Sequence, residues 1–167
     1  MKIYRLERET ILPIPIEQAW DFFSSPKNLK SITPPYMGFD IHSDVADKMY
    51  PGQIIVYTVT PLMGIPMKWV TEISHVIEGE LFVDEQRFGP YSLWHHKHFF
   101  KSVPGGTHMV DIVDYKLPFG LLGQIMHPII VKGKLEEIFT YRTEKMKELF
   151  GEAPIQRSQP KAEAVTL

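Results

Sequence analysis

Between residues 37 and 117 the chain alternates between apolar and polar residues with few interruptions. A period of two is typical of β-strands that bury one face. Short glycine- and proline-containing segments, such as Pro51-Gly52 and Pro104-Gly105-Gly106, divide this region and predict tight turns. Because short turns join neighbouring strands, we expect an antiparallel sheet. Its strands are predicted near 38–43, 53–60, 65–77, 81–89, 92–102 and 107–117.

The segments on either side of this region predict the remaining elements. Residues 3–12 also alternate and predict a seventh strand, and the segments IEQAWDFFSS and KNLKSI that follow predict two short helices. From about residue 128 to 150 apolar side chains recur three or four positions apart, which predicts one long helix. We therefore expect an α+β fold in which a curved seven-stranded antiparallel sheet wraps around the C-terminal helix. One domain is predicted over 1–150, followed by a disordered tail at 151–167.

The composition excludes several classes of function. Hydrophobic residues make up 44% of the 167 residues and charged residues 23%, which is an ordinary globular balance. The net charge of -2 offers no basic excess for nucleic acid, and the absence of cysteine excludes thiol catalysis and disulfides. No segment approaches the roughly 20 apolar residues of a membrane span. We expect a cytoplasmic protein, and the sequence leaves a homodimer open.

Alternation also assigns the side chains of each predicted strand to one of two faces. Charged residues such as Lys97, Lys101 and Arg87 mark the outer face. The apolar side chains of the opposite, inner face are Tyr57, Trp69, Phe82, Phe88, Trp94, Phe100, Val113 and Tyr115. The polar side chains of that face are Asp84, Gln86, His96, His98 and Asp111. Buried polar groups are costly unless they are hydrogen-bonded, so these five either satisfy one another or face a wet cavity and the polar end of a ligand. All thirteen residues are predicted to line a ligand-binding cavity.

The predicted N-terminal strand and the final helix carry a family likeness, and so do three further segments. They are PIPIEQAWDFFSSPKNLKSITPP, the predicted strand GPYSLWHHKHFF and the strand end VDYKLPFG. Over about residues 1–150 the chain resembles the SRPBCC ligand-binding superfamily, which includes START domains, birch-pollen-type allergens and polyketide cyclase-like proteins. It is most similar to a little-characterised bacterial branch. The resemblance implies a helix-grip fold with a deep cavity between the sheet and the C-terminal helix, and it transfers no catalytic residue.

The leading prediction is a non-catalytic protein that binds a small hydrophobic or amphipathic molecule, whether lipid-like, aromatic or polyketide-like. The alternative is a cyclase, dehydratase or hydrolase of small aromatic substrates that works through a histidine and an aspartate in the cavity. A third role, as an interaction domain, is suggested by the apolar loops at 61–66 and 119–126.

Metal binding is the remaining question that the histidines raise. His96 and His98 share a face and are suited to ligate a metal together with Asp84 or Asp111. No HExxH-type spacing supports such a site. The sequence therefore predicts neither a metal nor any other cofactor.

Overall fold

The computed structural model describes residues 2–62, 64–118, 120 and 131–152. The strands are β1 (Tyr4–Leu12), β2 (Asp40–Ile41), β3 (Gln53–Leu62), β4 (Ile65–Ile77), β5 (Leu81–Phe88), β6 (Leu93–Val103) and β7 (Gly106–Lys116). The helices are α1 (Ile16–Phe23), the 3₁₀ helices η1 (Pro26–Ile32) and η2 (Pro35–Met37), and α3 (Lys132–Phe150). Among the described residues, no helix is long and apolar enough to cross a membrane.

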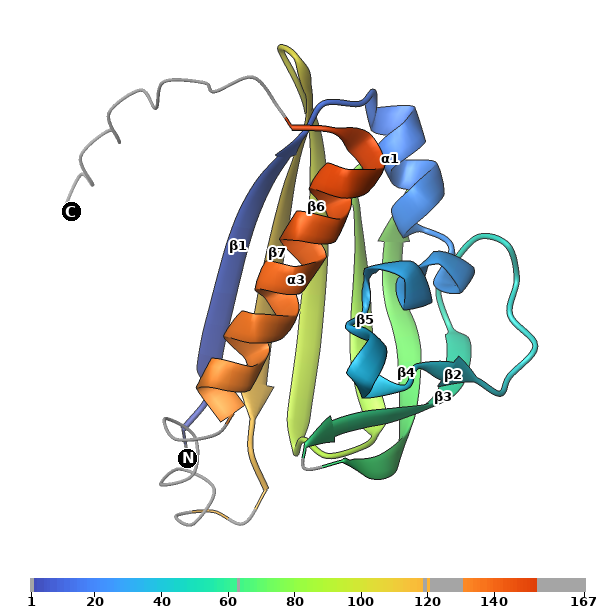
Figure 1. Ribbon diagram of the computed structural model, residues 1–167. Coiled ribbons are helices and arrows are strands. Elements are labelled where there is room, and N and C mark those ends of the chain that lie inside the picture. The colour runs from blue at the N-terminus through green and yellow to red at the C-terminus, as the bar shows by residue number, and fades with distance from the viewer. Residues whose placement is uncertain (1, 63, 119, 121–130, 153–167) are drawn as a thin grey trace, which may run out of the picture.

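The seven strands form one antiparallel sheet in the order β1-β7-β6-β5-β4-β3-β2. The sheet is strongly curved, and α3 lies across it over β1, β7 and β6 (Figure 1). The helices α1, η1 and η2 cover the other half of the same face (Figure 1). The predicted α+β arrangement, with a sheet that wraps around a C-terminal helix, is confirmed.

Periodicity in the sequence accounts for these elements. In β7 every second residue from Thr107 to Tyr115 is buried, as expected for a strand with one face on the core. In α3 the buried residues are spaced four, three and four apart, and they are Leu135, Phe139, Arg142 and Met146. The helix ends where the Gly151 amide donates to the Lys147 carbonyl at 2.8 Å. The predicted tail beyond residue 152 and most of the loop at 119–126 lie outside the described residues.

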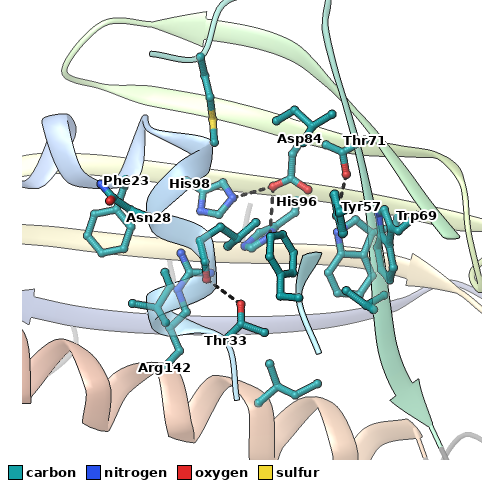
Figure 2. A pocket seen from close by; sticks show the side chains of 18 of the residues that line it. Phe23, Asn28, Thr33, Tyr57, Trp69, Thr71, Asp84, His96, His98 and Arg142 are labelled. Carbon is teal, nitrogen blue, oxygen red and sulfur yellow. Dashed lines mark hydrogen bonds and ion pairs between the residues drawn. The ribbon is translucent and has the colours of Figure 1, made fainter. Parts of the chain in front are cut away.

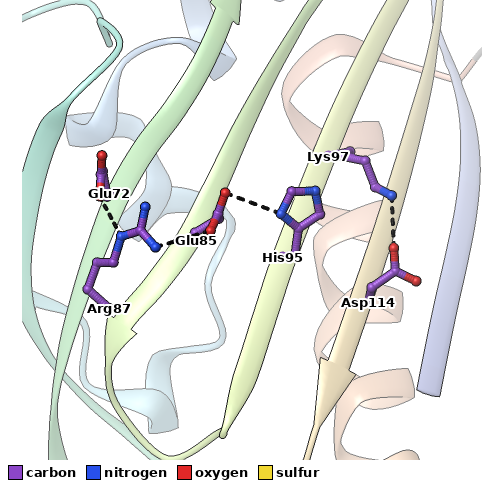
Figure 3. A network of polar contacts seen from close by, with 6 residues as sticks. All are labelled: Glu72, Glu85, Arg87, His95, Lys97 and Asp114. Carbon is purple, nitrogen blue, oxygen red and sulfur yellow. Dashed lines mark hydrogen bonds and ion pairs between the residues drawn. The ribbon is translucent and has the colours of Figure 1, made fainter. Parts of the chain in front are cut away.

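The outer face of the sheet carries charged side chains, as the alternation predicts. Arg87 contacts Glu72 and Glu85, and Lys97 donates to Asp114 at 2.8 Å (Figure 3). His95 also lies on this face, beside Glu85 (Figure 3). Exposed ion pairs of this kind contribute about 0–1 kcal/mol each, so they keep the face soluble more than they stabilise the fold.

A bulge in β5 overturns one of the predicted inward positions. Thr71 lies opposite Gln86 and Val70 lies opposite Phe88, so Arg87 is an extra residue on β5. An extra residue reverses the facing of the side chains that follow it. Phe88 consequently points outward and is 66% exposed. The prediction that Phe88 faces the cavity is wrong, because it assumed an unbroken period of two.

The hairpin between β6 and β7 packs closely against the end of β1. Gly106 has a φ of +151°, and a Cβ added there would lie 1.9 Å from the carbonyl oxygen of Leu12. Nearby, the hydroxyl of Thr107 donates to the carbonyl of Ile14 at 2.8 Å and is fully buried. Only a residue without a side chain allows the two backbones to approach this closely.

Candidate functional site

A cavity of about 160 Å³ lies between the concave face of the sheet and the helices. Strands β3 to β6 supply one wall, and α1, η1, η2 and α3 supply the other (Figure 2). Most of the lining is apolar and much of it is aromatic, including Phe23, Phe39, Tyr91 and Phe139. These four were not among the predicted site residues. Two lie on helices, which were not assigned to the site, whereas Tyr91 lies between two predicted strands and Phe39 lies in the predicted strand 38–43, for which no inner face was assigned.

Seven of the thirteen predicted site residues line this cavity. They are Tyr57, Trp69, Phe82, Asp84, Trp94, His96 and His98. The structure thus brings together residues from four strands, although their role in binding a ligand stays a prediction. Trp69 and Trp94 meet edge to face, with ring centroids 5.4 Å apart, and Tyr57 stacks on Trp69 at 6.1 Å.

The other six predicted residues lie outside the cavity lining. Phe100 packs in the core beneath α1, with its ring centroid 5.6 Å from that of Trp20. Val113 and Tyr115 are fully packed beneath α3. Gln86 holds the loop before β6, because its amide donates to the Tyr91 carbonyl at 2.6 Å and accepts from the Tyr91 amide at 3.1 Å. The remaining two are the exposed Phe88 and the deeply buried Asp111.

Asp111 takes part in a polar cluster with Asp84, His96 and His98, here named the His/Asp cluster. The residues face each other across β5, β6 and β7, where Asp84 lies opposite His96 and His98 lies opposite Asp111. The Nε2 atom of His96 is 3.0 Å from Asp111 Oδ1, and the Nε2 atom of His98 is 2.7 Å from Asp84 Oδ2. The histidine Nδ1 atoms make the other two contacts, His98 to Asp111 at 2.8 Å and His96 to Asp84 at 3.4 Å. Each histidine therefore bridges both carboxylates.

The two histidines differ in protonation. Burial alone would lower the pKa of His98, but its contacts with Asp111 and Asp84 outweigh burial and raise that pKa above its ordinary value. Burial and the charge of His98 lower the pKa of His96. At a pH between the two pKa values His98 is charged and His96 is neutral, and the shorter contact of His96, from Nε2 to Asp111, favours the tautomer with its proton on Nε2. This matches the 3.4 Å separation from Asp84, the longest of the four contacts.

Both carboxylates are ionised despite their burial. Burial would raise the pKa of Asp84, but its interactions with His96, His98 and Arg142 lower that pKa on balance. Burial opposes ionisation of Asp111 as well, yet the charge of Arg142 and the hydrogen bonds from the two histidines hold its pKa well below the usual range. The four residues of the cluster are thus electrostatically coupled, and Arg142 acts on them through its charge without a hydrogen bond to either carboxylate among the described residues.

Arg142 reaches the cavity from the inner side of α3 (Figure 2). It is 8% exposed, and its guanidinium carbon lies 5.6 Å from the centroid of the Phe23 ring and 6.0 Å from that of Phe139. Among the described residues, its Nε atom has no hydrogen-bond partner. The sequence carried a signal for this residue, because Arg142 falls on the helical stripe of Leu135, Phe139 and Met146. A cation on an otherwise apolar stripe makes Arg142 a candidate functional residue.

The donor set of a metal site is also present. One ligand atom each from Asp84, His96 and His98 lies within 4.8 Å of the others, and Asp111 contacts a ring nitrogen of both histidines. A carboxylate behind metal-ligating histidines is the usual arrangement that orients them. A proton on His98 also accounts for its contacts with both carboxylates without a metal. The absence of a metal stays a prediction.

Neither a protein-family model nor a curated protein matches the sequence. Solved structures do match its fold. Protein CV1439 from Chromobacterium violaceum is 12% identical with a TM-score of 0.66, and the match covers 89% of this chain and 96% of that one. The ginseng major latex-like protein 151 from Panax ginseng is 13% identical with a TM-score of 0.64, covering 89% and 97%. Protein Ms6760 from Mycobacterium smegmatis is 16% identical with a TM-score of 0.63, covering 89% and 96%. At these identities the likeness shows the fold alone, and it is the predicted helix-grip fold.

Proposed function

We propose that this helix-grip chain binds a small, mostly apolar molecule with a polar group inside the cavity. The observation that carries the proposal is the lining, in which a wall of aromatic rings surrounds the His/Asp cluster and Arg142. An engineered apolar cavity of about 150 Å³ takes up benzene, so a cavity of about 160 Å³ suits a ligand of one ring with short substituents. The fold shared with the latex-like protein supports a binding role.

The arrangement of the rings favours an aromatic ligand over a lipid-like one. The rings of Trp69, Trp94 and Tyr91 meet at centroid distances of 4.9 to 5.7 Å and at varied angles. An additional ring can stack on this group or meet it edge to face, which contributes about 0.5–1.5 kcal/mol beyond the burial of apolar area. A flexible alkyl chain gains only the burial term.

The test begins with native mass spectrometry of the protein purified from its own host. Titration with a panel of small aromatic and aliphatic amphiphiles then follows, with tryptophan fluorescence as the readout, since Trp69 and Trp94 line the cavity. We expect a co-purified molecule or saturable quenching. The variant Leu29→Trp fills the cavity and should abolish binding, whereas Phe88→Ser, on the outer face, should not. The proposal fails if no molecule co-purifies and no panel member binds, or if Leu29→Trp binds as well as the wild type.

A second candidate is an enzyme of small aromatic substrates, as a cyclase, dehydratase or hydrolase. The observation that favours it is His96 Nδ1, an unprotonated nitrogen beside the cavity whose ring is oriented by Asp111. Mass spectrometry of the bound molecule over time detects turnover. A catalytic role requires that His96→Gln stops product formation with little change in affinity. His95→Gln, on the outer face of the same strand, should keep full turnover. A wild-type protein that never changes its ligand excludes the enzyme.

A further inference from the structure

We infer that the ligand of this cavity carries a carboxylate, which pairs with the guanidinium of Arg142. The inference rests on the proposed function and specifies the class of ligand. It predicts that the protein selects small aromatic acids over neutral or cationic molecules of the same shape.

The first argument is the state of Arg142. Its side chain is nine-tenths buried and lines the cavity, yet no ion pair among the described residues includes it. Its neighbours at the guanidinium are the rings of Phe23 and Phe139, which attract a cation but do not neutralise it. A buried cation is costly unless a counter-ion and hydrogen bonds compensate it. A bound carboxylate would supply the hydrogen-bond acceptor that Arg142 Nε lacks among the described residues.

The second argument is that the nearby carboxylates are already engaged. Asp84 and Asp111 lie within 2.7 to 3.4 Å of histidine nitrogens, and they influence Arg142 only through space. With His98 charged and His96 neutral, the His/Asp cluster and Arg142 together are electrically balanced, but no acceptor in the part of the chain that the structure describes meets the guanidinium Nε. The planar fork of an arginine matches the two oxygens of a carboxylate, so this acid is the anion it fits best.

The third argument is the kind of polar atom left without a partner. Three buried side-chain atoms of the cavity lining make no hydrogen bond among the described residues, and one of them, His98 Nδ1, lies 2.8 Å from Asp111 Oδ1. The other two are Arg142 Nε and the indole Nε1 of Trp69. Both are donors. They lie on different sides of the pocket (Figure 2). A ligand rich in acceptors satisfies them, with the carboxylate at Arg142 and a second oxygen near Trp69. A cationic ligand would instead face the charge of Arg142.

The experiment compares two probes of nearly equal size, 3-phenylpropanoate and 3-phenylpropanamide, by isothermal titration calorimetry near pH 7.5. We expect the acid to bind roughly 10- to 100-fold more tightly than the amide, since hydrogen bonds to charged groups are the stronger ones. Arg142→Met should remove this preference, and Arg142→Lys should restore part of it. Lys132→Met, which removes an exposed cation of the same helix, should keep the wild-type preference.

The outcomes separate this inference from the proposed function. If the wild type binds the acid and the amide with equal affinity, the inference that the ligand carries a carboxylate is wrong, but the proposed binding function stands. An unchanged preference in Arg142→Met also overturns it. Failure of both probes and of the whole amphiphile panel removes the proposed function itself. Circular dichroism establishes that Arg142→Met is folded, and if it is not, the acid-to-amide ratio of the wild type decides alone.

Discussion

At the scale of single residues, the His/Asp cluster shows how neighbouring groups shift the pKa values of two histidines in opposite directions. His96 and His98 are two positions apart on one strand and contact the same two carboxylates. Their ring centroids are 3.7 Å apart, so two full charges would repel each other strongly. The closer contacts of His98 give it the proton, and its charge then keeps His96 neutral.

We predict that the two rings titrate on opposite sides of the ordinary histidine pKa of about 6.5. Stability from the raised pKa of His98 is present below that pH and is lost as the pH rises through the pKa of the folded state. Stability from the lowered pKa of His96 is present above it and declines as the pH falls. Nitrogen-15 NMR of the imidazoles measures both midpoints.

Asp111→Asn provides the matched test, because it removes one carboxylate partner of His98. The midpoint of His98 should then move down. Asp114→Asn, on the outer face of the same strand, should leave both midpoints in place. Two rings that titrate together near the ordinary value in the wild type would contradict the assignment.

The residues of the site were only partly predictable. Strict alternation located Asp84, His96 and His98 on the inner face. It also placed Phe88 there, because the bulge at Arg87 cannot be recognised from the sequence pattern. Alternation predicts which face of the sheet a side chain lies on, but not whether it lines a cavity or packs in the core. It therefore did not separate the lining residue Trp94 from the core residue Val113. Arg142 was recognisable only as a cation on an apolar helical stripe.

At the scale of elements, the turns between strands differ in how strictly their backbone conformation and packing require glycine. Gly79 has a φ of +75° and no atom within 4 Å of an added Cβ, whereas Gly106 faces the backbone of Leu12. Gly79→Ala therefore incurs only the strain of the left-handed backbone, about 1–2 kcal/mol. Gly106→Ala also forces β1 away from the β6–β7 hairpin.

We predict that Gly106→Ala lowers the free energy of unfolding by clearly more than Gly79→Ala does. Urea denaturation followed by circular dichroism measures both variants under the same conditions. Equal losses in the two proteins would show that the backbones at Leu12 and Gly106 separate without cost, contrary to the close approach described above.

At the scale of the whole molecule, a ligand that enters the cavity should stabilise the fold by mass action. At a free concentration 100-fold above its Kd, a ligand contributes about 2.7 kcal/mol. For a chain of this size that corresponds to a rise in the unfolding temperature of roughly 5–11 °C. Differential scanning calorimetry with 3-phenylpropanoate measures it. The same rise in Leu29→Trp would place the ligand outside the cavity.

Most of the fold was predictable because its signals are long and regular. Strands of eight or more residues such as β4, β5 and β6, and the long helix α3, agree closely with the periodicities of the sequence. The cavity was not predictable in size or shape. Its walls include Met49 and Tyr91, which lie between the predicted strands, and packing of distant elements decides where such residues lie.

The pairing of β1 with β7 has a consequence for how the protein forms. Tyr4 lies opposite Tyr115, and Leu12 lies opposite Thr107, so β1 meets its neighbour in the described sheet only after most of the chain has left the ribosome. Contacts between residues so distant in sequence slow folding, typically to milliseconds or seconds. Until then the backbone groups of β1 are unpaired. Charged side chains disfavour pairing of this segment with another chain, and they are Arg5, Glu7, Arg8 and Glu9. Its own sequence thus protects the growing polypeptide against premature association.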